Sequence, residues 1–193
     1  ASALVGDDAL IENCVNHGQI TGYRYPGGVA GYNGGGDSGY GTISNSTNTG
    51  KIIGNGKQGG GITAMNYCGD IVNCINKGQV TEAMYAGGIV GYGDGSTAKI
   101  GKIDKCTNEG HILASSAGGG ICGYNRNYSR ITDSSNSGKV ESMGDYAGGV
   151  CGYNETNGIV YNCTNTGSVK SNNGKYYWQR FICFSSKGNF RYP

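Results

Sequence analysis

The chain has 193 residues, of which 39 are glycine and 2 are proline, and its formal net charge is +2. Scarce proline without a Gly-X-Y period excludes collagen, and regularly placed apolar residues argue against a disordered chain. The net charge is small and no run of like charges occurs, which predicts no nucleic-acid partner. No stretch reaches the ~18 apolar residues of a membrane helix, which predicts no membrane insertion.

One pattern recurs six times along the chain. It reads Ile/Val-x-x-Cys/Ser-x-Asn-x-Gly-x-Ile/Val, and Gly-Gly-Ile/Val follows about ten residues later in the first five copies, within a period of about 30 residues. Its two invariant positions are Asn16, Asn48, Asn76, Asn108, Asn136 and Asn165, and Gly18, Gly50, Gly78, Gly110, Gly138 and Gly167. A fixed period of this length predicts a stacked array of repeats rather than an ordinary globular core.

The first copy shows how one repeat is expected to fold. Asn-x-Gly and Gly-Gly interrupt its apolar segments too often for helices, so we expect short strands at residues 10–15, 19–23 and 28–32. Three short strands in each repeat predict an all-β, single-stranded parallel β-helix of about six coils, about 4.8 Å apart, over residues 1–170. Crossovers between parallel strands are nearly always right-handed, so we expect a right-handed coil.

Matching residues of successive repeats should lie above one another as columns. The apolar columns would be Ile11, Ile43, Ile71, Ile103, Ile131 and Val160; Ile20, Ile52, Val80, Ile112, Val140 and Val169; and Val29, Ile62, Ile89, Ile121 and Val150. A fourth column would hold Tyr32, Met65, Tyr92, Tyr124 and Tyr153. Stacked asparagine amides would bond along the axis, and the glycine two residues later is expected to turn a corner with positive φ.

Two connections are longer than the others, at residues 34–42 and 94–102. They should project from one edge of the stack two coils apart, about 10 Å. Loops on a rigid scaffold often carry recognition. We therefore expect any binding surface to include them.

Most of the eight cysteines fall on repeat positions. Cys14, Cys74, Cys106 and Cys163 share one column with Ser46 and Ser134, Cys122 and Cys151 share another, and Cys68 and Cys183 lie off the pattern. A position shared by cysteine and serine indicates a small buried residue, and stacked side chains point in parallel, which suits a disulfide poorly. We therefore expect free thiols.

Four segments of the chain resemble the GLUG motif, a Gly-aliphatic-x-Gly repeat: Gly28-Val29-Ala30-Gly31, Gly88-Ile89-Val90-Gly91, Gly120-Ile121-Cys122-Gly123 and Gly149-Val150-Cys151-Gly152. The second copy has Ala64 in place of the last glycine. GLUG repeats occur in large bacterial surface proteins, including adhesin-like proteins and immunoglobulin-A-specific metallopeptidases. The resemblance implies a structural or adhesive role outside the cell. It does not imply the peptidase activity, because no His-Glu-x-x-His occurs here.

Candidate chemistry is sparse. His17 and His111 belong to different repeats and should lie too far apart to share a metal. Gly54–Gly59 matches the letters of a dinucleotide-binding fingerprint, but no helix is expected after it to hold the pyrophosphate. Gly34–Gly39 resembles a single calcium-binding nonapeptide, a motif that works in tandem. Asp104 and Asp133 would occupy comparable positions of adjacent coils, at the spacing of a retaining glycosidase pair, although two surface acids explain them more simply. We predict no catalytic, cofactor-binding or metal-binding residue and no cofactor.

After Val169 the pattern ends, and residues 171–193 form a divergent, aromatic-rich segment. We expect it to cap the apolar end of the solenoid, with a docking segment for self-association or the start of a further domain as alternatives.

The resemblance to GLUG repeats, with no catalytic cluster beside it, implies a non-catalytic structural or adhesive repeat module of an exported bacterial protein, located at the cell surface or outside the cell as a mature fragment. Its partner would be a host or cell-surface glycan or protein. The alternative is a glycan-binding or polysaccharide-processing β-helix, since the chain contains 15 tyrosines.

Overall fold

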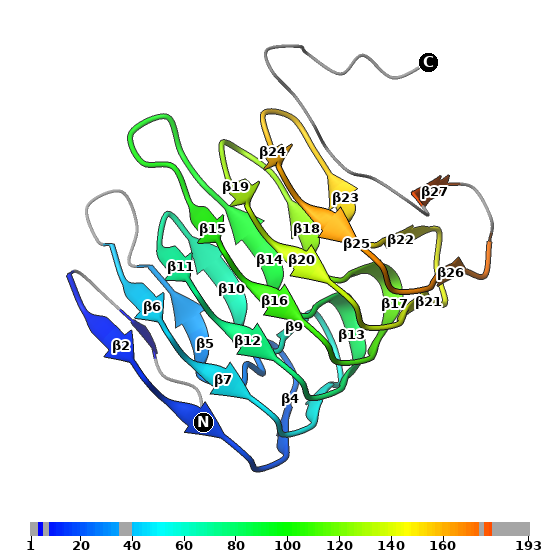
Figure 1. Cartoon of the computed structure of the whole chain (residues 1–193), viewed down its shortest axis with the longest axis horizontal. Coiled ribbons are helices and arrows are strands. Elements are labelled where there is room, and N and C mark those ends of the chain that lie inside the picture. The colour runs from blue at the N-terminus through cyan, green and yellow to red at the C-terminus, as the bar shows by residue number, and fades with distance from the viewer. Residues whose placement is uncertain (1–3, 6–7, 35–39, 174–175, 179–193) are drawn as a thin grey trace.

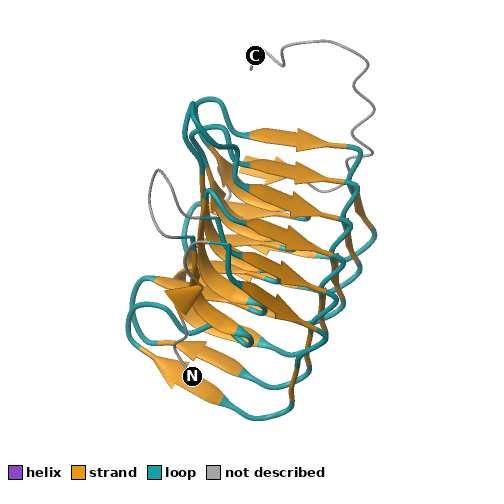
Figure 2. Cartoon of the chain, turned by 90° about the vertical axis from the view of Figure 1, so that its left-hand side faces the viewer, coloured by secondary structure: helices purple, strands orange, loops and turns teal. Residues whose placement is uncertain are grey.

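The protein is an all-β parallel solenoid of about five turns. A computed structural model describes residues 4–5, 8–34, 40–173 and 176–178, and these contain no helix. Every strand pairing is parallel, and successive coils lie side by side from the N-terminal end to the C-terminal end (Figures 1 and 2). The predicted parallel β-helix is confirmed.

Four sheets run the length of the stack. Sheet A contains β1 (Leu4–Val5), β5 (Ala30–Asn33), β10 (Thr63–Tyr67), β14 (Val90–Asp94), β18 (Cys122–Asn125) and β23 (Cys151–Asn154). Sheet B contains β2 (Leu10–Glu12), β6 (Thr42–Ser44), β11 (Asp70–Val72), β15 (Lys102–Asp104), β19 (Arg130–Thr132) and β24 (Ile159–Tyr161). Sheet C contains β3 (Val15–Asn16), β7 (Thr47–Asn48), β12 (Ile75–Asn76), β16 (Thr107–Asn108), β20 (Ser135–Asn136) and β25 (Thr164–Asn165).

Sheet D has more and longer strands than the other three sheets. It contains β4 (Ile20–Gly22), β8 (Ile52–Gly54), β9 (Gln58–Gly60), β13 (Val80–Gly87), β17 (Ile112–Gly119), β21 (Val140–Ser142), β22 (Tyr146–Gly148), β26 (Val169–Ser171) and β27 (Tyr176–Trp178). The long strands β13 and β17 each pair with two shorter strands of a neighbouring coil. Strand β27, within the divergent segment, pairs with β22, while residues 179–193 lie outside the described part of the chain.

The prediction of three strands in each coil is wrong, because a corner divides the first expected strand. Residues 10–15 separate into β2 and β3 at Asn13, whose φ is 56°. The same corner recurs in each repeat with φ between 48° and 56° at Asn45, Asn73, Lys105, Asp133 and Asn162. Asparagine and aspartate tolerate this left-handed conformation better than most residues, which explains why they fill five of the six corners.

The expected positive φ at the glycine after each ladder asparagine is also wrong. Gly34 is the one described glycine with φ in the left-handed region, at 112°. What the column requires is space: a Cβ on Gly50, Gly78, Gly110, Gly138 or Gly167 would lie 2.0 Å from the carbonyl oxygen of the matching glycine in the coil before it. The glycines therefore allow two backbones to approach closely.

The predicted apolar columns are confirmed as the core. Ile43, Ile71, Ile103 and Ile131 are in register and fully buried, and Ile52, Val80, Ile112 and Val140 form a second buried group on sheet D. Five cysteines, Cys14, Cys74, Cys106, Cys122 and Cys151, are free thiols. Cys183 lies outside the described residues.

Hydrogen-bonded asparagine side chains form a continuous ladder along sheet C. Each Nδ2 donates to Oδ1 of the asparagine in the next coil, at 2.7 or 2.8 Å, from Asn16 through to Asn165. Each Nδ2 also donates to the carbonyl oxygen of the glycine two residues later, at 2.9 Å. The predicted ladder is confirmed, and it ties each coil to the next inside the protein.

A second, interrupted ladder lies at the end of sheet A. Asn33 donates to Asn66 and Asn125 donates to Asn154, both at 2.8 Å, while Gly93 occupies the middle coil. Because Gly93 has no side-chain amide to donate, Oδ1 of Asn125 is buried without a partner among the described residues.

The Gly-Gly-aliphatic-x-Gly segments join sheet D to sheet A through direct backbone contact. A Cβ on Gly87 would lie 1.9 Å from the carbonyl oxygen of Val90, and one on Gly88 would lie 2.3 Å from Cγ of the ladder residue Asn108. A Cβ on Gly91 would lie 2.8 Å from the backbone of Gly59 in the preceding coil. Each of these three glycines therefore occupies a position where the Cβ of any other residue would clash with a neighbouring atom.

Candidate functional site

Two rows of side chains face each other across the turn between sheets D and A. The sheet A row is Tyr32, Met65, Tyr92, Tyr124 and Tyr153, as predicted. The sheet D row is Tyr25, Gln58, Tyr85, Ala117 and Tyr146. Tyr25 lies beside Gln58, because the neighbouring Gly27 pairs with Gly60 and Gln58 N–H donates to the carbonyl oxygen of Arg24.

Tyrosine rings of the two rows are in contact in the first coil, where Tyr25 meets Tyr32 edge to face at 6.0 Å, and again from the third coil onward. Tyr92 stacks on Tyr124 with ring centroids 5.0 Å apart and planes 3° apart, and Tyr124 lies 5.0 Å from Tyr153. Tyr85 is tilted against both Tyr92 and Tyr124, at 5.8 and 4.9 Å, and Tyr146 meets Tyr153 edge to face at 4.7 Å. Such contacts contribute beyond the burial of ring area.

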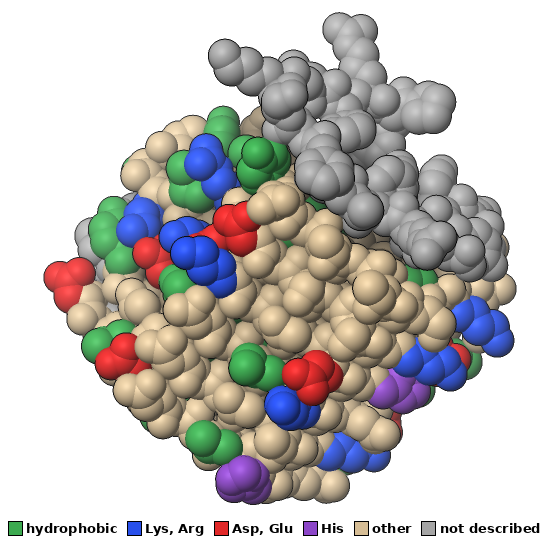
Figure 3. Space-filling view, viewed as in Figure 1, with side chains coloured by type: hydrophobic (Ala, Val, Ile, Leu, Met, Phe, Trp, Pro, Cys, Tyr) green, Lys and Arg blue, Asp and Glu red, His purple; other side chains and the backbone are tan. Residues whose placement is uncertain are grey.

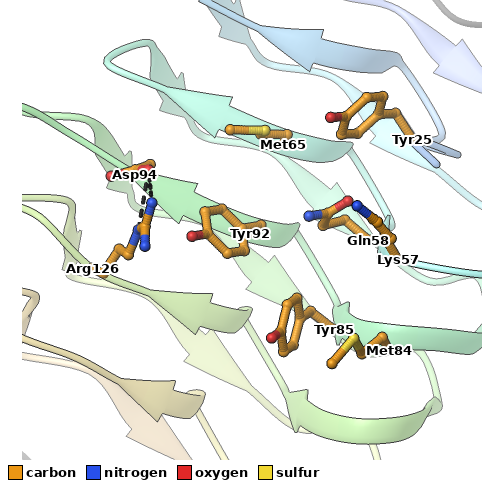
Figure 4. Close-up of a pocket in the computed structure, with 9 residues that line it drawn as sticks. All are labelled: Tyr25, Lys57, Gln58, Met65, Met84, Tyr85, Tyr92, Asp94 and Arg126. Carbon is orange, nitrogen blue, oxygen red and sulfur yellow. Dashed lines mark hydrogen bonds and ion pairs between the residues drawn. The ribbon is translucent and has the colours of Figure 1, made fainter.

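Two hollows open where the sheet D row has no tyrosine. The first, of about 350 Å³, lies at Gln58 (Figure 4) and is lined by Tyr25, Lys57, Gln58, Met65, Met84, Tyr85, Tyr92, Asp94 and Arg126. The second, of about 120 Å³, lies at Ala117 and is lined by Tyr85, Ser116, Ala117, Tyr124, Tyr146 and Tyr153. Tyr85 lines both hollows and so separates them. We call this surface the tyrosine groove.

An ion pair forms one side of the first hollow. The Arg126 guanidinium donates from Nε and Nη2 to Oδ2 of Asp94, at 3.2 and 3.1 Å, and lies 5.3 Å from the Tyr92 ring centroid. Asp94 is buried, at 4% exposure, and its Oδ1 also accepts the Gly95 N–H. Lys57 and Gln58 lie on the other side of Tyr92 (Figure 4). The first hollow therefore combines aromatic surface with a small number of polar groups.

Burial of the phenols affects their ionisation. Burial raises the pKa of Tyr92 to about 12, despite the opposing effect of Arg126. Burial, together with the 2.5 Å hydrogen bond from the Tyr124 hydroxyl to Glu155, also raises the pKa of Tyr124. Both phenols remain protonated and able to donate hydrogen bonds well above neutral pH.

The groove should make the fold sensitive to alkali. Because the folded pKa of Tyr92 exceeds the ordinary value of 10, its contribution to stability is complete below pH 10 and is lost as pH rises toward 12. Tyr92→Phe should lose less stability over this interval than the wild-type chain. Denaturant unfolding at several pH values measures this loss of stability in both proteins, and phenolate absorbance gives a second signal. A loss between pH 10 and 12 that is equal in the two proteins would contradict this assignment.

The structure separates the candidate acid pair. Asp104 pairs in register with Thr132, whose hydroxyl donates to Oδ1 of Asp104 at 2.6 Å. Asp133 is a corner residue with φ of 48° that accepts a hydrogen bond from Asn162. The expectation of comparable positions is wrong, because Asp133 follows Thr132 at the corner and so corresponds to Lys105.

The other candidates also lie apart. His17 bonds Thr49 at 2.7 Å, whereas His111 contacts Glu141 at 2.7 Å in a different part of the stack. Residues 54–59 run from β8 into β9 without a helix. The two long connections meet where Lys99 Nζ of the second lies 4.2 Å from the Tyr40 ring centroid of the first connection. Residues 35–39, which contain most of the calcium-like motif, lie outside the described part of the chain.

No group of three metal-binding side chains occurs within the described ranges. The same residues include no helix of the length and apolar character needed to cross a membrane. Among the described residues on the face in Figure 3, charges of both signs are scattered between neutral polar side chains, without the single-sign patch of a nucleic-acid interface.

Sequence reasoning found the sheet A row but missed the sheet D row and hence the groove. The available signal was Tyr-x-Gly-Gly, which occurs at Tyr25, Tyr85 and Tyr146, in the first, third and fifth repeats. Because it skips every second repeat, a search for six-fold columns does not show it.

Comparison with known proteins identifies one family model. The model of the GLUG motif matches residues 22–53, 114–141 and 144–170. No curated protein matches the chain, and neither does any solved structure. Residues between the matched segments join the same four sheets in the same register, so the repeat is structurally continuous.

Proposed function

Because this chain is a β-solenoid module built from GLUG-motif repeats, we propose that it is a non-catalytic structural and adhesive module of a bacterial cell-surface or secreted protein. The continuous asparagine ladder is the observation that carries this proposal. Five rungs join the six strands of sheet C, and the three middle rungs, between Asn48 and Asn136, are fully buried. A stack joined in this way holds a lateral surface at a fixed geometry.

The arrangement of acidic side chains favours binding over catalysis. Asp94 pairs with Arg126, Asp104 with Lys102 and Thr132, and Glu141 with Lys139 and His111. A glycoside hydrolase needs two carboxyl groups that flank one bond, one of them able to give a proton. Despite desolvation, the Thr132 hydrogen bond and Lys102 lower the pKa of Asp104, and contacts with Lys139 and His111 lower the pKa of Glu141, so these two carboxyls are poor proton donors at neutral pH.

The tyrosine groove supplies the adhesive surface. Aromatic side chains offer large contact area at low conformational cost, and their hydroxyls add hydrogen bonds. The adhesive partner would be a glycan or protein outside the cell.

The proposal is tested with the whole chain immobilised on beads. The beads are applied to glycan and extracellular-matrix protein arrays, and soluble polysaccharides incubated with the chain are assayed for new reducing ends. Saturable adhesion without new ends is the expected result. Release of sugar products, or adhesion to neither array, would overturn the proposal.

A further inference from the structure

The sheet D row alternates along the solenoid axis. Over the first five coils tyrosine occurs at Tyr25, Tyr85 and Tyr146, with Gln58 and Ala117 between them, and the alternation ends where Tyr176 pairs with Tyr146. Tyrosines two coils apart are separated by two strand spacings, about 10 Å. The hollows at Gln58 and Ala117 share this spacing, so the groove has a repeat of two coils rather than one.

The first hollow contains a polar atom without a partner. Oε1 of Gln58 is buried, and no described residue donates to it. Buried polar atoms are nearly always paired, so the Gln58 amide would gain a hydrogen bond by turning Oε1 toward a donor in the hollow. The first hollow, of about 350 Å³, is an open groove on the surface whose lining combines aromatic rings with polar side chains.

We propose that the tyrosine groove binds a linear β-1,4-linked polysaccharide along the solenoid axis. Sugar rings one and three of a bound segment fill the hollows at Gln58 and Ala117, and ring two crosses Tyr85. Two strand spacings, about 10 Å, match the two-ring repeat of such an extended chain. The ring C–H groups contact tyrosine, and the Gln58 side chain turns so that its Oε1 accepts a hydrogen bond from a sugar hydroxyl. This inference rests on the proposed adhesive function and names its ligand.

The same spacing argues against an extended peptide. Side chains on one face of a β-strand repeat every two residues, about 6.7 Å, which does not match a site that repeats at about 10 Å. A helical α-1,4-linked glucan does not match either, because it curves away from a straight groove.

Titration calorimetry with tetrasaccharides tests the ligand class. The probes are the β-1,4-linked tetramers of glucose and of N-acetylglucosamine, and the α-1,4-linked glucose tetramer is the matched control. At least one β-linked tetramer should bind saturably, at least tenfold more tightly than its own dimer and than the α-linked tetramer. Binding of neither β-linked tetramer, or equal binding of the α-linked control, would overturn the inference.

Variants that fill the hollows test the location. Gln58→Tyr and Ala117→Tyr place in each hollow the residue that neighbouring coils carry there, and each should weaken tetramer binding at least tenfold. Tyr23→Ala is the matched control, because Tyr23 is 66% exposed and lines neither hollow. Circular dichroism and thermal unfolding show whether each variant is folded. Folded filling variants that bind as the wild type does would reject the groove.

The outcomes separate this inference from the function on which it rests. Adhesion to proteins with no binding of β-linked tetramers would reject the polysaccharide and leave the adhesive module. Groove-dependent binding accompanied by new reducing ends would retain the ligand and reject the non-catalytic role.

Discussion

Asn108→Ala is expected to lower the free energy of unfolding by about 4 kcal/mol or more. Asn108 is fully buried, donates to Asn136 Oδ1 at 2.7 Å and to the Gly110 carbonyl oxygen at 2.9 Å, and accepts from Asn76 Nδ2 at 2.7 Å and from Gly110 N–H at 3.2 Å. Truncation removes four hydrogen bonds where water does not reach, each worth about 0.5–1.5 kcal/mol, although Asn76 Nδ2 still donates to Gly78 and Asn136 Oδ1 still accepts from Gly138. Denaturant unfolding followed by circular dichroism measures the change.

Two further variants assign the effect to the ladder. Asn16→Ala removes an end rung, where the side chain is partly exposed and water replaces the lost bonds, so about 1 kcal/mol is expected. Asn108→Asp keeps the shape but cannot donate to Asn136 and buries a charge, so it should destabilise at least as much as alanine. Equal losses for Asn108→Ala and Asn16→Ala would show that the buried ladder does not hold the coils together.

The ladder and the apolar columns could be predicted because one repeat length sets both spacing and register. Once Asn48 and Asn76 are assigned to adjacent coils, the residues between them must align as well. The same period indicates which positions face the core, because stacked Ile71 and Ile103 can be buried only if every matching position is buried. Repetition thus supplies the long-range contacts that a single copy does not contain.

The features that were missed either lack such repetition or repeat without a recognised turn signal. The fourth strand depends on a left-handed corner, which Asn13 and even Lys105 adopt without the glycine that normally signals it. The second ladder is broken at Gly93, so its column is not invariant. The sheet D row recurs every second coil and comes into contact with Tyr92 only through the glycine turn that joins sheets D and A. These are properties of packing between segments, which a linear pattern does not display.

Gly110→Ala is expected to destabilise the protein by about 3 kcal/mol or more. The added Cβ would lie 2.0 Å from the Gly78 carbonyl oxygen and 2.8 Å from Asn76 Nδ2. Neither atom can move away without a large energetic cost, because one belongs to the backbone of the adjacent coil and the other is hydrogen-bonded in the ladder. The coils must separate locally, which lengthens the hydrogen bonds between them. Denaturant unfolding should show a lower midpoint with an unchanged slope, as expected for loss of stability without loss of cooperativity.

Gly18→Ala distinguishes crowding from backbone conformation as the reason for this glycine column. Gly18 holds the same repeat position, but its added Cβ would meet nothing nearer than Asn16 Oδ1 at 3.7 Å, an ordinary contact. If space is what the column requires, Gly18→Ala should change stability by no more than about 0.5 kcal/mol, with a small gain from the stiffer unfolded chain. If the column required a left-handed φ, alanine would be strained at both positions. A large loss at Gly18 would therefore reject the steric explanation, because no described residue of a neighbouring coil crowds that position.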